Sequence, residues 1–347
     1  MDVNLLDSLQ TIIQPAANRW EAMADKALRG EVLTKEEALQ VLAAPDMELL
    51  PLLQAAYRVR HRHFGNKVKL NMIINAKSGL CPEDCGYCSQ SIRSAAPIDK
   101  YPLLAKETLV AGAREAMQRK AGTYCIVTSG RGITDRELDQ VIEAVREIKR
   151  EMPLKICACL GLITQEQAEK LKAVGVDRYN HNLNTSAGHY AQIATTHTYE
   201  DRVRTVNHAK QAGLSPCSGC IVGMGETHED VYEMALALRH LDADSIPVNF
   251  LNPIPGTPLE GRNDLDPRYC LKVLCLFRFI HPNKEIRIAG GREVNLRSLQ
   301  PLGLYPANAI FVGDYLTTAG QEAALDHQMI ADLGFEIEEC FENSHWV

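Results

Sequence analysis

The chain has 347 residues, 46% of them hydrophobic and 23% charged, which is the composition of an ordinary globular protein. The formal net charge of -7 argues against nucleic acid or an anionic membrane as a partner. Because the acidic N-terminus lacks the features of a signal or transit peptide and no apolar run reaches membrane-spanning length, we predict a cytoplasmic protein.

Residues 1–65 are predicted to form a helical extension. Apolar residues recur at helical intervals after Trp20, and the sequence Thr34-Lys-Glu-Glu37 is a capping box that opens a further helix. The helical pattern continues from residue 47 to residue 63. We expect this extension to pack outside or beneath the domain that follows it.

From about residue 67, short apolar runs alternate with longer amphipathic stretches, a pattern that indicates βα units and a parallel sheet. The eight candidate strands are 68–75, 123–127, 154–160, 177–181, 215–222, 245–251, 285–289 and 308–311. Eight such units predict an α/β fold, a TIM-type (β/α)8 barrel over residues 66–320, with its active site at the carboxyl ends of the strands. A C-terminal helix and tail would occupy residues 321–347.

Three cysteines follow the first predicted strand in the sequence Cys81-Pro-Glu-Asp-Cys85-Gly-Tyr-Cys88. Thiolates are the usual protein ligands of iron–sulfur clusters, and this spacing can place three sulfurs on three irons of a cubane while the fourth iron stays open. A zinc knot or an electron-transfer cluster would normally need four protein ligands. A disulfide framework is disfavoured by the odd total of eleven cysteines. We therefore favour the open iron.

Four more cysteines lie inside predicted strands, namely Cys125, Cys157, Cys159 and Cys217. Because strand side chains alternate between faces, Cys157 and Cys159 share one face, and Cys217 shares one with Ile221 while Cys220 points away.

A single barrel cysteine is commonly a small hydrophobic residue, but three or four on neighbouring strands indicate a second cluster, deeper in the barrel. The seventh strand adds Arg287, with no acidic residue obviously reserved for it. Four further cysteines, at positions 220, 270, 275 and 340, are interpreted as packing or surface residues.

Three asparagines, Asn180, Asn182 and Asn184, alternate along the end of the fourth predicted strand and so share a face. Amides at a barrel mouth supply donors and acceptors suited to ureido, ribose or carboxylate groups. The alternative is an asparagine-rich turn without a ligand.

Two resemblances add to this interpretation. The cysteine spacing, with Tyr87 before the last cysteine, resembles the signature of radical S-adenosylmethionine enzymes. Over almost the whole chain, residues 81–91, 179–186, 217–226 and 287–293 resemble the biotin synthase family. That family inserts sulfur into dethiobiotin, and the resemblance implies the same activity here.

The resemblance implies a [4Fe-4S] cluster on Cys81, Cys85 and Cys88, with S-adenosylmethionine on its open iron. It also implies a [2Fe-2S] cluster held by Cys125, Cys157, Cys217 and Arg287. Since Cys159 should face the lumen as well, a cluster with more irons that uses it stays open as an alternative.

By the same resemblance, the expected substrate contacts are Lys77, Asn180, Asn182 and Asn249. The expected cofactor contacts are Tyr87, Asn182, Asn184, Arg202, Ile221 and Asn249. Many family members carry aspartate at the position of Asn184. For Arg202, which lies on a predicted helix, a surface ion pair is the alternative.

The expected partners are a flavodoxin-type electron donor, iron–sulfur assembly machinery and a second copy of the chain in a homodimer. Two other classes of protein are the alternatives. A hydrogenase maturase or methylornithine synthase would keep the cysteine loop without needing the cysteine and arginine set of the barrel, and an electron carrier would need no row of asparagines.

Overall fold

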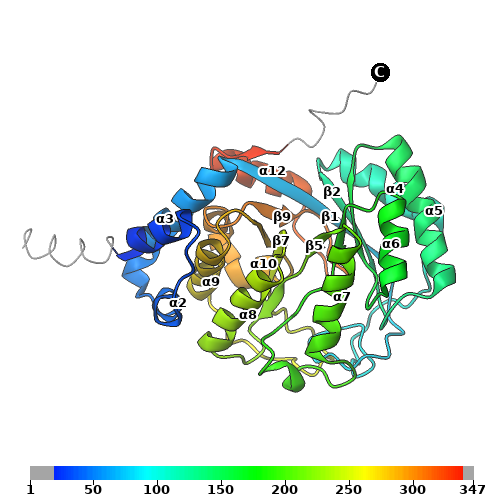
Figure 1. Ribbon diagram of the computed structural model, residues 1–347, viewed down its shortest axis with the longest axis horizontal. Helices are drawn as coiled ribbons and strands as arrows, with labels where there is room; N and C mark the ends of the chain where they lie inside the picture. The colour runs from blue at the N-terminus through cyan, green and yellow to red at the C-terminus, as the bar shows by residue number, and fades with distance from the viewer. Residues whose placement is uncertain (1–18, 339–347) are drawn as a thin grey trace, which may run out of the picture.

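The computed structural model describes residues 19–338 (Figure 1). The extension contains a helical stretch at residues 19–28, α2 (Lys35–Leu42), a short 3-10 helix (Asp46–Glu48) and α3 (Leu49–Phe64). The predicted capping box opens α2, because the Thr34 side chain accepts from the Glu37 backbone while the Glu37 carboxylate accepts from the Thr34 backbone. Both α2 and α3 pack on α9 (Pro267–Ile280), outside the barrel.

The predicted barrel is confirmed. Its strands are β1 (Lys67–Lys77), β2 (Thr123–Thr128), β3 (Lys155–Cys159), β4 (Arg178–Asn180), β5 (Ser215–Cys217), β6 (Cys220–Val222), β7 (Ser245–Phe250), β8 (Glu285–Ile288) and β9 (Ala309–Phe311). They pair in parallel in the order β1-β2-β3-β4-β5-β7-β8-β9, and β9 pairs back with β1 to close the ring. The carboxyl ends of all these strands therefore meet at one mouth.

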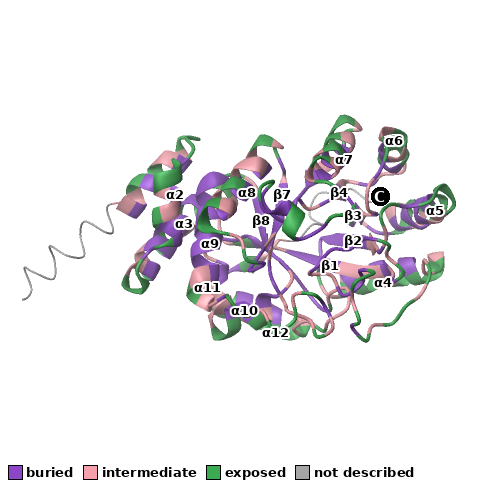
Figure 2. Cartoon of the chain, turned by 90° about the horizontal axis from the view of Figure 1, so that it is seen from below, coloured by how far each residue is buried: buried purple, intermediate pink, exposed green. Residues whose placement is uncertain are grey.

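Helices surround the ring, and apart from α9 they turn their buried faces toward the strands and their exposed faces outward (Figure 2). After α3 they are α4 (Lys106–Gln118), α5 (Asp135–Glu151), α6 (Gln165–Ala173), α7 (Tyr199–Gln211), α8 (His228–His240), α9, α10 (Arg292–Leu296) and α11 (Gln300–Gly303), with two 3-10 helices at Tyr190–Gln192 and Arg297–Leu299. Capping boxes at Thr134 and Thr164 open α5 and α6 in the same way.

The fifth predicted strand is broken in two, which the sequence pattern did not predict. Between β5 and β6 the chain passes so close to β7 that a Cβ on Gly219 would lie 1.9 Å from the Pro247 carbonyl oxygen. Only glycine fits such an approach. The predicted directions of the Ile221 and Cys220 side chains are nevertheless confirmed. Ile221 lines the central cavity, while Cys220 is buried in the core outside it.

The chain ends, as far as it is described, with α12 (Ala323–Asp332) and β10 (Glu336–Ile337), which pairs in parallel with the start of β1. A buried ion pair between Arg292 and Asp326, 2.7 Å, fastens α12 to α10. Cys340 lies outside the described residues. No helix in residues 19–338 is both long and apolar enough to cross a membrane.

Candidate active site

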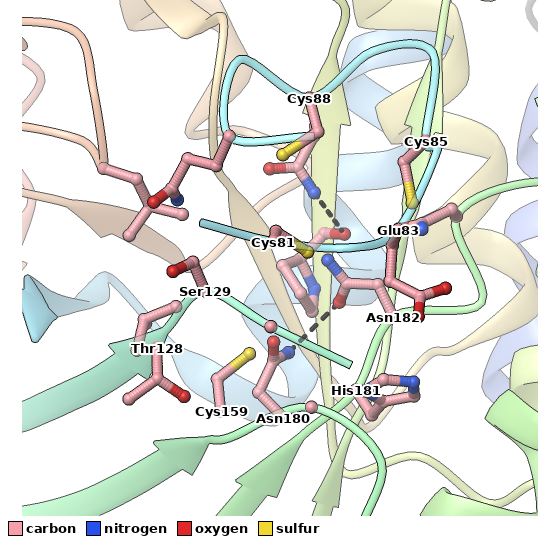
Figure 3. Close-up of a pocket in the computed structure, with 18 of the residues that line it drawn as sticks. Cys81, Glu83, Cys85, Cys88, Thr128, Ser129, Cys159, Asn180, His181 and Asn182 are labelled. Carbon is pink, nitrogen blue, oxygen red and sulfur yellow. Dashed lines mark hydrogen bonds between the residues drawn. The ribbon is translucent and has the colours of Figure 1, made fainter. Parts of the chain in front are cut away.

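One cavity at the mouth of the barrel collects most of the predicted site residues. Those that line it are Cys81, Cys85, Tyr87, Cys88, Cys125, Cys157, Asn180, Asn182, Asn184, Arg202, Ile221, Asn249 and Arg287. Figure 3 shows the loop with Cys85 and Cys88 on one side of the cavity and Cys159 with Asn180 on the opposite side. Cys217 is fully buried beside this cavity.

The first group of thiols, Cys81, Cys85 and Cys88, lies on the loop after β1. Burial raises the pKa of all three, that of Cys88 to about 12. Bare thiols in these surroundings stay protonated, whereas coordination to a metal removes the proton. All ten cysteines in the described residues are free, so these thiols are available as ligands.

Within residues 19–338, no three His, Cys, Asp or Glu side chains converge as they would around a single metal ion. A cluster of several irons offers each thiolate an iron of its own, so its ligands need not converge on one point. The three free thiols, facing one cavity from one loop, therefore fit a cubane better than a zinc ion.

The conformation of this loop is fixed by an acidic residue inside it. Asp84 accepts hydrogen bonds from the backbone N–H of Thr195, 2.9 Å, and of Thr196, 3.2 Å, and from the Thr195 hydroxyl, 2.5 Å. Although burial opposes the shift, these hydrogen bonds lower the pKa of Asp84. The segment before α7 thus serves as the support of the cysteine loop.

Arg202 enters the cavity from α7 and is buried, so the alternative of a surface ion pair is wrong. Its Nη1 donates to the Asn182 carbonyl, 2.9 Å, and its Nε donates to the Tyr190 hydroxyl. With its oxygen turned toward them, the Asn184 amide accepts from Nη1 and Nη2, 3.2 Å each, and from the Tyr87 hydroxyl, 2.5 Å. The Asn184 amide oxygen thus lies between Nη1 and Nη2 of the guanidinium and accepts from both.

A fourth contact of Arg202, with His197, was missed at the level of sequence. Arg202 Nη2 lies 2.6 Å from His197 Nε2, and His197 Nδ1 lies 2.5 Å from Glu83 Oε2. Burial, and then the charge of Arg202, lower the pKa of His197, which favours the neutral imidazole. Glu83 lies within the cysteine loop, but nothing in the sequence connects it with a histidine 114 residues away.

The asparagines form a row across the cavity. Asn180 Nδ2 donates to Asn182 Oδ1, 3.1 Å, and to Cys217 Sγ, 3.2 Å. Since Asn184 contacts Tyr87 of the cysteine loop, the row reaches from one group of thiols to the other. On β7, two strands along the ring from β4, the Asn249 amide is fixed by the Cys220 carbonyl and the Gly290 N–H, both 2.9 Å away.

The second group of thiols lies deeper in the barrel. Cys125 and Cys157 are register partners on β2 and β3, and Cys217 lies on β5. The three pack together in one buried cluster with Phe311.

Cys159 lines the same cavity as Cys157, as alternation predicted. It is paired in register with Val127, one face position nearer the mouth, and lies outside the cluster formed by the other three thiols. Burial raises the pKa of Cys159 to about 12.

Arg287 lies beside the second group, and the prediction that it lacks an acidic partner is wrong. Its Nη2 donates to Glu285 Oε1, 2.6 Å, and to Ser245 Oγ, 2.9 Å. The partner lies two residues earlier on β8, hence on the same face. Arg178 also pairs with Glu285, 2.9 Å.

The second group of thiols and Arg287 contain polar atoms that could bind an iron–sulfur cluster. Three buried thiols packed in one cluster, and a buried Arg287 Nε without a partner among the described residues, leave hydrogen-bonding and ligand capacity unused. Such unused capacity is unusual in a protein interior and fits a sulfur-rich anionic group at this position.

Lys77 is the last residue of β1, and its side chain points away from the cavity toward α5. Its ammonium pairs with Glu137 Oε1, 2.6 Å, at the start of α5, and Lys77 is not among the residues that line the cavity. Its expected substrate contact stays a prediction.

A (β/α)8 barrel that carries three free thiols on the loop after its first strand defines the class of radical S-adenosylmethionine enzymes, and residues 77–238 match the model of the Radical SAM superfamily. Residues 247–336 match the Biotin and Thiamin Synthesis associated domain. Biotin synthase of Geobacillus kaustophilus is 67% identical over 92% of this chain and 96% of its own length. The chain belongs to the biotin synthase family.

Biotin synthase of Bacillus subtilis is a further relative, 64% identical over 92% of this chain and 96% of its own. Among solved structures, methylornithine synthase superposes with a TM-score of 0.81 at 21% identity, covering 92% of this chain and 98% of its own. The FeFe-hydrogenase maturase HydG from Carboxydothermus hydrogenoformans gives 0.77 at 16% identity, covering 97% and 84%. These two likenesses concern the fold alone.

Family membership carries the activity with it. The chain is a radical S-adenosylmethionine enzyme of biotin synthesis that inserts sulfur into dethiobiotin, and it uses a [4Fe-4S] cluster and S-adenosylmethionine.

Proposed function

We propose that the two groups of thiols hold two iron–sulfur clusters and that dethiobiotin binds between them, where it is activated from the mouth and receives its sulfur from the depth. The observation that carries this proposal is the row of asparagine side chains, which runs from Tyr87 on the cysteine loop to the thiol of Cys217. A ligand on this row is within reach of both groups.

For the first cluster we propose Cys81, Cys85 and Cys88 as ligands. The proposed contacts of S-adenosylmethionine are Tyr87, Asn182, Asn184, Arg202, Ile221 and Asn249. The support for Arg202 is its buried cation, because a carboxylate taking the place of the Asn184 oxygen at its fork would gain two charge-assisted hydrogen bonds.

For the second cluster, a [2Fe-2S] group, we propose the ligands Cys125, Cys157, Cys217 and Arg287. Three thiols packed together and the unpaired Arg287 Nε support this set. Glu285 and Ser245 hold the other end of the guanidinium, so they fix the direction in which Arg287 faces the thiols.

When bound, the two clusters supply the one-electron reduction of S-adenosylmethionine and the sulfur atom, chemistry that no side chain could provide. The protein's part is to orient the substrate and to exclude water. We propose that the amides of Asn180, Asn182 and Asn249 bind the ureido ring, since amides match its donors and acceptors. Apolar side chains on the cavity wall, such as Ile73 and Phe311, keep water from the reacting carbon atoms. Lys77 is kept as a substrate contact on resemblance alone.

We further propose a flavodoxin-type electron donor, iron–sulfur assembly machinery and a homodimer. These partners rest on the family resemblance, and a cytoplasmic location rests on the clustered cysteines, which in a reducing compartment more often serve metal chemistry than disulfides. Loss of a sulfur atom at each turnover requires a source that replaces it, which supports the assembly machinery.

An anaerobic assay tests the proposal. The reconstituted protein is given reductant, S-adenosylmethionine and dethiobiotin, and 5'-deoxyadenosine and biotin are quantified together by mass spectrometry. We expect two equivalents of deoxyadenosine for each biotin. The variant Cys85→Ala should form neither product, whereas Cys157→Ala should form deoxyadenosine without biotin. Biotin formation by Cys157→Ala at the parent rate would contradict the proposed sulfur source.

A further inference from the structure

We propose that Glu83 and His197 are positioning residues, which hold Arg202 in the orientation that accepts the cofactor carboxylate and tie it to the cysteine loop. The inference rests on the proposed contact between Arg202 and the cofactor. Neither Glu83 nor His197 is needed as a cluster ligand or a substrate contact in the function described above, although both line the cavity.

The three side chains form a chain of two short contacts, Glu83 Oε2 to His197 Nδ1 at 2.5 Å and His197 Nε2 to Arg202 Nη2 at 2.6 Å. A guanidinium can only donate, so Nε2 must accept. The ring proton is therefore on Nδ1 and is donated to the Glu83 carboxylate. This carboxylate fixes the tautomer and the plane of the imidazole, as carboxylates do for metal-bound histidines.

The remaining N–H groups of Arg202 show which side of the guanidinium is free to exchange. Tyr190 and the Asn182 carbonyl take up one N–H each, and His197 takes up another. The two that remain point to the Asn184 amide oxygen at 3.2 Å. A neutral amide oxygen is a weaker acceptor than a carboxylate. The three fixed contacts thus aim the two exchangeable N–H groups at the position proposed for the ligand.

Glu83 links this arrangement to the first group of thiols, because it lies between Cys81 and Cys85 in the chain. Its carboxylate also accepts from the Thr196 hydroxyl, 2.5 Å, and from Arg131, 3.3 Å. Glu83, His197 and Arg202 are all buried, so water does not compete for these contacts. A change in Glu83 or His197 therefore alters the aim of Arg202 relative to the cysteine loop.

The test is a binding measurement that needs no turnover. The dissociation constant of S-adenosylmethionine is measured by anaerobic equilibrium dialysis on protein loaded with its [4Fe-4S] cluster. The variant His197→Phe removes both contacts and should weaken binding roughly tenfold, the usual effect of losing a hydrogen bond to a charged group. The variant His197→Gln offers a donor and an acceptor again and should recover part of the affinity, as a merely structural role would not predict.

Three companion measurements separate the outcomes. Iron content and thermal midpoint show whether a variant folds, and Glu83→Gln provides a second route if His197→Phe does not. The matched control His208→Phe changes a histidine on α7 whose Nδ1 lies 2.8 Å from the Ile163 carbonyl oxygen and which does not line the cavity, so it should bind like the parent. The paramagnetic resonance spectrum of the reduced [4Fe-4S] cluster, recorded with and without S-adenosylmethionine, shows whether the bound cofactor still changes the cluster in each variant.

Parent-like affinity in folded His197→Phe and Glu83→Gln, together with weak binding by Arg202→Gln, would overturn this inference and leave the proposed function intact. Parent-like affinity in Arg202→Gln as well would instead overturn the proposed cofactor contact itself. Equal weakening in His197→Phe and His197→Gln would show that shape, rather than the two hydrogen bonds, is what His197 provides.

Discussion

Cys159 is the residue that decides how large the inner cluster can be. It faces the cavity but lies one face position nearer the mouth than Cys157 and outside the packed group of three thiols. We therefore expect Cys159→Ala to keep the parent's iron and sulfide content, while Cys157→Ala, the matched change two residues away, loses the inner cluster. Iron and sulfide counting on anaerobically reconstituted protein checks this. A loss of iron in Cys159→Ala would instead support the alternative of a larger cluster that uses Cys159 as a ligand.

His281, at the end of α9, makes stability depend on pH. Burial, followed by the charges of Arg239 and Arg278, lowers its pKa to about 3. Below pH 6.5, His281 takes up a proton in the unfolded chain but stays neutral in the folded chain. The free energy of unfolding therefore falls as the pH falls from 6.5 toward 3.

Between pH 6.5 and 5.0, His281 should lower the free energy of unfolding by about 2 kcal/mol, which corresponds to about 1.36 kcal/mol for each pH unit. The thermal midpoint of His281→Leu should therefore decline less between pH 8.0 and 5.0 than that of the parent. Equal declines in the two proteins would rule out His281 as the cause.

At this scale the sequence predicts residues that act through local spacing, and it fails for contacts between distant segments. The two sets of cysteines and the three asparagines were predicted from spacing and alternation. Glu285 could have been found in the same way, as the residue two before Arg287 on one strand. The contact between Glu83 and His197 could not, because the loop after β1 and the segment before α7 meet only in the folded barrel.

Among the secondary-structure elements, the break between β5 and β6 controls the position of Cys217. A Cβ on Gly219 would collide with the Pro247 carbonyl oxygen, which is rigid backbone, so Gly219→Ala must displace β5 or β7. We expect a lower thermal midpoint and loss of the inner cluster. The matched variant Gly188→Ala, with nothing within 4 Å of the added methyl group, should behave like the parent.

Iron content and thermal midpoint, measured on both glycine variants, check this prediction. Intact inner-cluster absorption in Gly219→Ala would mean that the close approach is not needed. Helix starts were predictable because each capping box is local, whereas the break in the fifth strand depends on a neighbour 28 residues away, at Pro247, and so has no local signal.

For the molecule as a whole, the N-terminal extension completes the core. Helix α9 is buried at every position from Cys270 to Ile280, which a barrel helix with one face in solvent would not be. The covering side chains come from α2 and α3, and Leu52 on α3 is fully buried in the same core as α9.

Leu52→Asp should therefore place a charge in this core and destabilise the whole protein by several kcal/mol, since a buried unpaired charge is costly. The matched variant Leu50→Asp, on the same helix but 67% exposed, should stay within about 0.5 kcal/mol of the parent. Thermal unfolding followed by circular dichroism compares the two. Similar midpoints for both variants would show that the barrel does not depend on its extension.

The two groups of thiols differ in how much of the chain must be assembled before they exist. The first lies within residues 81–88, so a single turn brings its sulfurs together. The second draws on β2, β3 and β5, with Arg287 added from β8, and these strands come together only when most of the ring has formed. During refolding, iron uptake should therefore come in two stages, an early one on the local turn and a late one on the assembled ring. The amount of iron bound in the late stage would count the chains that have completed the barrel.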